Sequence, residues 1–103
     1  MPAFDPSAVR RELLHLDLAV YAPLKGALAE FVRYYGIDME AQVAGVRHYA
    51  GWFEMPGYQI AAHVFMPTDA QGTVFILHGY LDHAGLYHHL IRDCLQRGYA
   101  VVV

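Results

Sequence analysis

The segment from His78 to Tyr87 holds the densest group of residues that could do chemistry. It reads His-Gly-Tyr-Leu-Asp-His-Ala-Gly-Leu-Tyr and directly follows a short apolar run, Thr73 to Leu77. A glycine just after a buried strand lets the backbone turn sharply, so that the next amide, that of Tyr80, can point into a crevice. A backbone N–H in such a place can stabilise negative charge that develops on a substrate oxygen. The sequence therefore predicts an oxyanion-binding amide at Tyr80.

The spacing of this segment resembles the oxyanion loop of the monoacylglycerol lipase and lysophospholipase branch of α/β-hydrolases, a serine aminopeptidase-like branch. An apolar strand, His-Gly, three residues, His, a small residue, Gly, any residue and Tyr follow one another in that order. The resemblance covers Val46 to Val103, which corresponds to the N-terminal part of such a domain. It implies a hydrolase of carboxylic esters, acylglycerol or lysophospholipid-like, with Tyr80 N–H in the oxyanion hole and with no cofactor. The residues expected to support the loop are His78, Gly79, His83 and Gly85.

The reacting groups of that family are not found in this sequence. Such enzymes use a serine in a Gly-x-Ser-x-Gly elbow, followed along the chain by an acid and a histidine. The only serine here is Ser7, which lies at the start of the chain and outside any such motif. We therefore expect nucleophile, acid and base to lie outside these 103 residues, the ester substrate to be bound by a full-length form, and the chain alone to be inactive. The alternative is a non-catalytic fragment or binding module with the hydrolase half-fold.

Other chemistry-bearing residues favour structural roles. Asp82, His83, His88 and His89 could be proposed as metal ligands, but their spacing differs from the paired i, i+4 histidines of zinc helices, so we predict no metal site. Cys94 lies on the apolar stripe of a predicted helix, which indicates a buried structural thiol. An aromatic cluster on the predicted hairpin is interpreted as cross-strand packing rather than as a lipid platform; it comprises Tyr49, Trp52, Phe53 and Tyr58.

Composition excludes several classes of protein. Hydrophobic residues make up 56% of the chain and charged residues 17%, which is typical of a globular fold rather than a disordered segment. A net charge of −3 gives no basic field for nucleic acid. One cysteine cannot form an internal disulfide, and no apolar run is long enough to span a membrane. Near the N-terminus, charged residues interrupt the apolar stretch that a signal peptide would need. We therefore expect a cytoplasmic protein with no nucleic-acid partner and no membrane span.

The elements that would position the loop follow from hydrophobic periodicity. Asp5-Pro6 has the form of a helix start, and an apolar stripe, Val9, Leu13, Leu16 and Val20, predicts that this helix continues to about Pro23. A second stripe from Leu24 to Tyr35, with Gly36 as C-cap, predicts a second helix. Val46–Phe53 and Tyr58–Phe65, joined by Met55-Pro56-Gly57, predict an antiparallel hairpin.

The last third of the chain predicts a parallel βαβ unit. The run Thr73–Leu77 is expected to be a strand buried on both faces, Leu86–Leu95 a helix closed by Gly98, and Tyr99–Val103 a second strand. The predicted class is α/β, the N-terminal portion of an α/β-hydrolase fold, with a helical extension over 1–40 and an incomplete hydrolase domain over 41–103. In the family the Val74–Leu77 strand pairs on both sides; here one edge is expected to stay uncovered, which predicts self-association.

Overall fold

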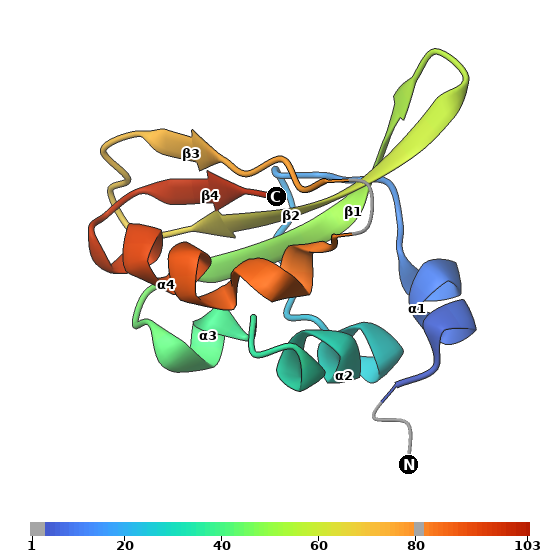
Figure 1. Ribbon diagram of the computed structural model, residues 1–103, viewed down its shortest axis with the longest axis horizontal. Coiled ribbons are helices and arrows are strands. Elements are labelled where there is room, and N and C mark those ends of the chain that lie inside the picture. The colour runs from blue at the N-terminus through green and yellow to red at the C-terminus, as the bar shows by residue number, and fades with distance from the viewer. Residues whose placement is uncertain (1–3, 80–81) are drawn as a thin grey trace.

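The computed structural model describes residues 4–79 and 82–103, and it shows a mixed four-stranded sheet with helices on one face (Figure 1). The strands are β1 (Arg47–Met55), β2 (Tyr58–Met66), β3 (Thr73–Phe75) and β4 (Ala100–Val102), in the order β1-β2-β4-β3. β1 pairs antiparallel with β2, β2 antiparallel with β4, and β3 parallel with β4. The described chain is therefore of the α/β class, with the hairpin attached to one side of a parallel βαβ unit.

The hairpin turns where its sequence predicts. Met55 faces Tyr58 across a two-residue loop of Pro56 and Gly57, and Gly57 has a φ of 82°. Proline has a φ suited to the first central position of a type II turn, and the second position needs a positive φ that glycine adopts without steric cost. The turn fixes the register of all nine pairs between β1 and β2.

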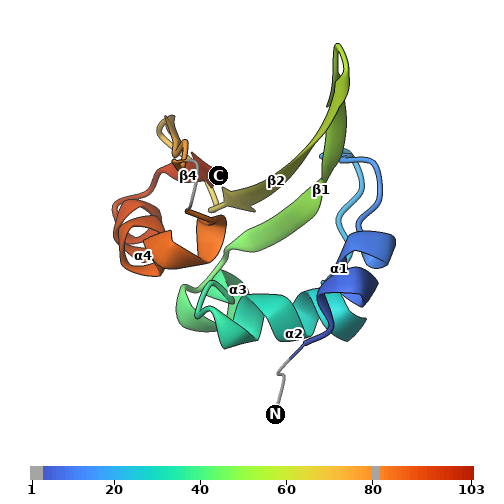
Figure 2. The same ribbon diagram turned by 45° about the vertical axis from the view of Figure 1, so that its right-hand side comes forward.

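The helices cover the sheet from one side. They are α1 (Pro6–Glu12), α2 (Gly26–Tyr34), α3 (Met39–Gln42), a short 3₁₀ helix η1 (Ala84–Tyr87) and α4 (His88–Gln96). Figure 2 shows α2, α3 and α4 together on the same side of the sheet. The core between them and the sheet consists of Val32, Ile37, Met39, Val46, Phe65, Ile76, Ile91, Leu95 and Val101. Residues from the helical first third and from the βαβ unit thus share one apolar core.

The first predicted helix is correct at its start and wrong at its end. Asp5 caps it by accepting the N–H of Ser7 at 3.0 Å, and Pro6 is its first residue, but α1 ends at Glu12 instead of near Pro23. The irregular segment 13–25, here called the strap, runs beside β1 instead (Figure 2). Its backbone pairs with the edge of β1 through Leu16 N–H to Trp52 O (2.8 Å) and Trp52 N–H to Leu14 O (2.9 Å). Those strand-like bonds replace the helical ones, so the apolar stripe never forms a helix face.

The second helix and the βαβ unit agree with their predictions more closely. α2 lies within the predicted range, and Gly36 follows it with a φ of 71°. Gly98 follows α4 with a φ of 87°, before β4 begins at Ala100. The short helix α3 was not predicted, because four residues are too few for a periodic stripe.

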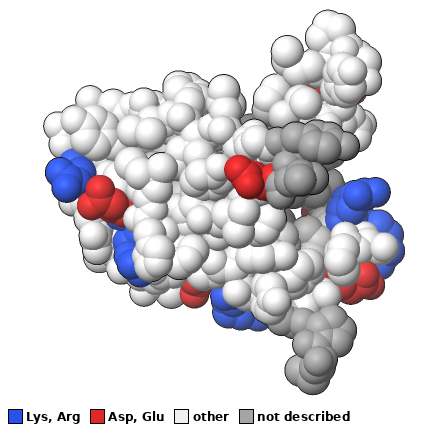
Figure 3. Space-filling model, viewed as in Figure 1, with Lys and Arg blue, Asp and Glu red and all other residues white. Residues whose placement is uncertain are grey.

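The expectation that β3 is buried on both faces is wrong. Ile76, just beyond β3, is buried, whereas Phe75 is 69% exposed and Leu77 is 92% exposed. The helices cover only the face that carries Ile76, and the described residues place nothing over the opposite face at β3. The surface over β3 and β4 in Figure 3 is correspondingly free of charged side chains.

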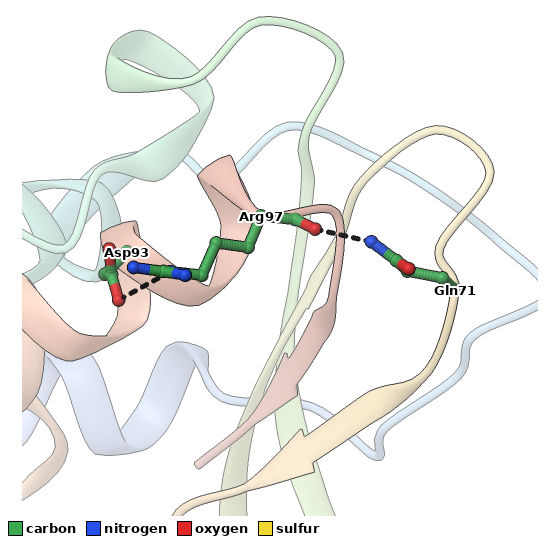
Figure 4. Close-up of polar contacts among 3 residues, drawn as sticks. All are labelled: Gln71, Asp93 and Arg97. Carbon is green, nitrogen blue, oxygen red and sulfur yellow. Dashed lines mark hydrogen bonds and ion pairs between the residues drawn. The ribbon is translucent and has the colours of Figure 1, made fainter.

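The loop that leads into β3 is tied to the end of α4 (Figure 4). The side-chain amide of Gln71 donates to the carbonyl of Arg97 at 2.6 Å, and Gln71 N–H donates to the carbonyl of Gly98 at 3.0 Å. Arg97 in turn forms an exposed ion pair with Asp93 at 3.1 Å, one helical turn earlier. These contacts fix where β3 begins and hence where the His78–Tyr87 loop leaves the sheet.

Candidate functional site

The segment from His78 to Tyr87, here called the oxyanion loop after the role that its sequence predicts, follows the carboxyl end of β3 and ends with η1. Ligand sites of open α/β sheets lie at this end of the strands. His78 is exposed, and its Nδ1 lies 3.1 Å from the carbonyl oxygen of Gly79. Tyr80, the predicted oxyanion donor, lies outside the described residues.

Asp82 holds the oxyanion loop together. Its Oδ2 accepts the backbone N–H of Gly79 at 3.4 Å and the hydroxyl of Tyr87 at 2.9 Å, and its own N–H donates to Gly79 O at 3.1 Å. The bond to the carboxylate raises the pKa of the Tyr87 hydroxyl, because the charged acceptor favours the protonated phenol. One carboxylate therefore links the start of the loop to its end.

His83 and Gly85 support the loop in a different way. The Nδ1 of His83 accepts the N–H of Gly85 at 3.2 Å and so caps η1. The ring of His83 packs edge-on against Tyr35 with centroids 4.5 Å apart. A Cβ at Gly85 would come within 2.5 Å of the Tyr35 ring, so this close approach requires glycine.

Sequence reasoning identified Asp82 only as a possible metal ligand, and it missed its bridging role. The signal was available in part, since an aspartate three residues after a turn glycine can accept that glycine's N–H. The bond from Tyr87 could not be predicted without the path of the loop. The structure brings Asp82, Gly79 and Tyr87 together and leaves the ring of His78 on the surface.

A second cluster of polar side chains, which the sequence does not predict, lies between the hairpin and α2. His48 on β1 is only 2% exposed, and its Nε2 lies 2.9 Å from the Nδ1 of His63 on β2. His48 stacks on Phe65 with centroids 4.2 Å apart, and His63 is parallel to Phe31 of α2 at 6.0 Å. The Pro-Gly turn already sets this register, because His63 pairs with Ala50 and hence lies diagonally opposite His48 on the same face.

Burial keeps this histidine pair uncharged. Desolvation lowers the pKa of His63 from 6.5 to about 4. Desolvation, and then the neighbouring His63, lowers the pKa of His48 well below 6.5. The facing carboxylate of Glu40 accepts the backbone N–H of His48 at 2.9 Å and the hydroxyl of Tyr21. At neutral pH one imidazole of the pair must therefore donate and the other accept.

The remaining candidates stay apart from these sites. Ser7 lies in the first turn of α1, and Cys94 is half-buried on α4 against the core. Among the described residues, no three side chains of the metal-ligating types lie close enough to hold an ion. His88 and His89 do contact each other, with ring centroids 4.0 Å apart, and Arg92 lies 3.1 Å from His89 Nδ1.

Comparison with known proteins gave no match to any family model, any curated protein or any solved structure. None of the helices in the described part of the chain is both long and apolar enough to cross a membrane.

Proposed function

We propose that this chain supplies the oxyanion loop of a hydrolase that acts on carboxylic esters of the acylglycerol or lysophospholipid type. The observation that carries the proposal is the pair of hydrogen bonds that the Asp82 carboxylate accepts, one from Gly79 N–H and one from Tyr87 O–H, after the end of β3. The proposal also draws on the resemblance of the His78–Tyr87 motif and on the parallel βαβ unit that presents it.

The chemical advantage of such a loop is that its amides are oriented before the substrate arrives. Donors that are fixed in advance stabilise the developing oxyanion without reorganisation during the reaction. Asp82 fixes the N–H of Gly79 and so restrains the backbone on one side of the proposed donor, Tyr80; the bond from Tyr87 restrains the other side. Asp82 is thus a positioning residue in this proposal, and Tyr80 N–H is the group that meets the substrate.

The nucleophile, acid and base of the reaction would come from outside these 103 residues. Neither Ser7 nor Cys94 lies in the oxyanion loop, since Ser7 is in the first turn of α1 and Cys94 packs against the core from α4. The proposed ester substrate is a small molecule, and no cofactor takes part in this chemistry.

Hydrolysis of p-nitrophenyl butyrate tests the proposal, with the longest reading frame that contains these residues as the enzyme. We expect that frame to be active and the 103-residue chain to be inactive. Asp82→Ala should lower kcat by about 10²-fold with little change in KM, because lost oxyanion stabilisation affects the transition state. Asp93→Ala is the matched control, since Asp93 makes only an exposed ion pair on α4.

Three results would contradict the proposal. Activity in the 103-residue chain would require a different nucleophile. An unchanged kcat for Asp82→Ala in an active longer chain would remove the positioning role of Asp82. Absence of activity in every reading frame would favour the alternative, a non-catalytic binding module.

A further inference from the structure

A cavity of about 700 Å³ lies between the strap, the start of α2 and the first residues of β1, on the hairpin side of the molecule. Figure 2 shows the strap and the start of α2 beside β1. Pockets for small ligands usually occupy 300–1,000 Å³ and are mainly apolar with a few polar groups that fix orientation. The size of this cavity falls in that range.

Aliphatic side chains dominate the lining, and the acidic groups at its rim are already bonded. Leu16, Leu24 and Leu28 line the cavity. The carboxylate of Glu12 accepts the N–H groups of Ala27 and Leu28 at the start of α2, at 3.3 and 3.4 Å. Asp17 accepts the N–H of Ala19 at 2.9 Å. The rim therefore offers an incoming molecule apolar contact more than free negative charge.

His48 is the only buried polar side chain that the described residues contribute to this lining. Its Nε2 is engaged with His63, and no described residue bonds its Nδ1. If His48 Nε2 donates to His63, Nδ1 is an acceptor; if Nε2 accepts, Nδ1 is a donor. A hydroxyl group can serve in either case, because it both donates and accepts, whereas a carboxylate cannot donate and adds a charge beside a neutral imidazole.

We propose that the strap cavity binds a neutral aliphatic alcohol, with its chain against Leu16, Leu24 and Leu28 and its hydroxyl at His48 Nδ1. The strap itself supports an apolar occupant. Leu14 is 73% exposed and Val20 is 65% exposed, and both line the cavity, so a bound chain would remove them from water. The site is separate from the oxyanion loop and does not depend on the proposed hydrolase.

Saturation binding of 1-octanol to the full 103-residue chain tests this inference, followed by NMR of the imidazole groups at pH 7. We expect saturable binding that shifts the ring signals of His48 and His63 and leaves those of His89 unchanged. Sodium octanoate, which has the same chain length with a charged head, should bind at least about tenfold more weakly, a difference of about 1.4 kcal/mol.

Two tryptophan substitutions on the strap locate the site. Ala22 lines the cavity and is exposed, so Ala22→Trp should fill part of it and weaken octanol binding by about tenfold or more. Leu18 is 51% exposed on the same strap but does not line the cavity, so Leu18→Trp should bind octanol as the original chain does.

The outcomes separate the possible occupants. Stronger binding of octanoate than of octanol would overturn the proposal in favour of an anionic amphiphile held by Lys25, which also lines the cavity. Equal loss in both tryptophan variants, saturable binding without a His48 shift, or no saturable binding would each overturn it as well.

Discussion

The two outer strands of the sheet differ in how their free edges are treated. β1 is covered by the strap. Leu14 and Leu16 of the strap both form backbone hydrogen bonds with Trp52, and the ring of His15 between them packs against the Trp52 ring with centroids 4.7 Å apart. β3 has no strand on its outer side among the described residues, and its last residue, Phe75, and Leu77 just beyond it are largely exposed. The edge of β1 is completed by Leu14 and Leu16, which lie 38 and 36 positions before Trp52 in the chain, whereas the outer edge of β3 has no such partner among the described residues.

This difference places the two candidate sites of the molecule in different surroundings. The covered side contains the buried histidine pair and the strap cavity. The uncovered side carries the oxyanion loop, whose bonds are local and mostly exposed to water. Exposed strand edges promote pairing with other chains, so the two sides should respond differently to acid, to substitution and to protein concentration.

Acid should affect the covered side first and most strongly. Unfolded His63 binds its proton near pH 6.5, but folded His63 binds it only near pH 4. The stability that neutral His63 provides is therefore complete above pH 6.5 and is lost as the pH falls to about 4, which amounts to about 3 kcal/mol from His63 alone. Urea unfolding across this range should show the decline, and amide exchange at pH 4.5 should rise in β1 and β2 before β3 and β4.

The double variant His48→Phe/His63→Leu provides the check on this prediction. It should lose most of the decline between pH 6.5 and 4, leaving the part that carboxylates contribute. His89→Gln is the control, because His89 is exposed on α4 and should leave the decline intact. A decline that is equally steep in the double variant would show that the buried pair is not its cause.

Detaching the strap should have the next largest effect. A Cβ at Gly51 would come within 2.6 Å of Leu16 Cα and 2.7 Å of Leu14 O, which are backbone atoms that cannot move independently. Gly51→Val should therefore displace the strap from β1 and cost about 2 kcal/mol. Because Trp52 is the only tryptophan and lies at the bridge, its fluorescence should shift to the red as it becomes exposed.

Leu18→Ala tests whether this loss is specific to the contact. Leu18 belongs to the strap but is half-exposed. Its truncation should therefore change the free energy of unfolding by less than about 0.5 kcal/mol and leave the emission maximum of Trp52 unchanged. Folding of Gly51→Val with unchanged stability and an unshifted Trp52 spectrum would mean that the strap contributes little to the covered edge.

The same comparison shows what periodicity can and cannot predict. The hairpin was predictable because alternation and a Pro-Gly turn act locally, and so was the βαβ unit, because α4 is amphipathic with Gly98 at its end. The strap was not, because its stripe of Leu13, Leu16 and Val20 fits a helix equally well. Only the contact of Leu14 and Leu16 with β1, a long-range interaction, decides its conformation.

The candidate site divides in a similar way. The motif predicts His83 and Gly85 as supports of the loop, and the structure places His83 at the cap of η1 and Gly85 against Tyr35. The role of Asp82 depends on Tyr87 returning to it across the loop, and the pairing of His48 with His63 depends on the hairpin register. Side-chain pairs that are created by tertiary folding leave only indirect marks in the sequence.

Placing a charge beside the uncovered edge should have the smallest effect on folding and a clear effect on association. We expect the 103-residue chain to associate as its concentration rises, measured by light scattering, because β3 offers unpaired backbone groups next to apolar Phe75 and Leu77. Phe75→Lys should change the free energy of unfolding by less than about 0.5 kcal/mol, because Phe75 is 69% exposed, yet weaken association by about tenfold. Tyr58→Lys is the matched control, since Tyr58 is 72% exposed at the far tip of the hairpin and should leave association unchanged. A monomer at all concentrations would mean that the edge of β3 is protected despite its exposure; association weakened equally by both variants would assign it to net charge instead of to this edge.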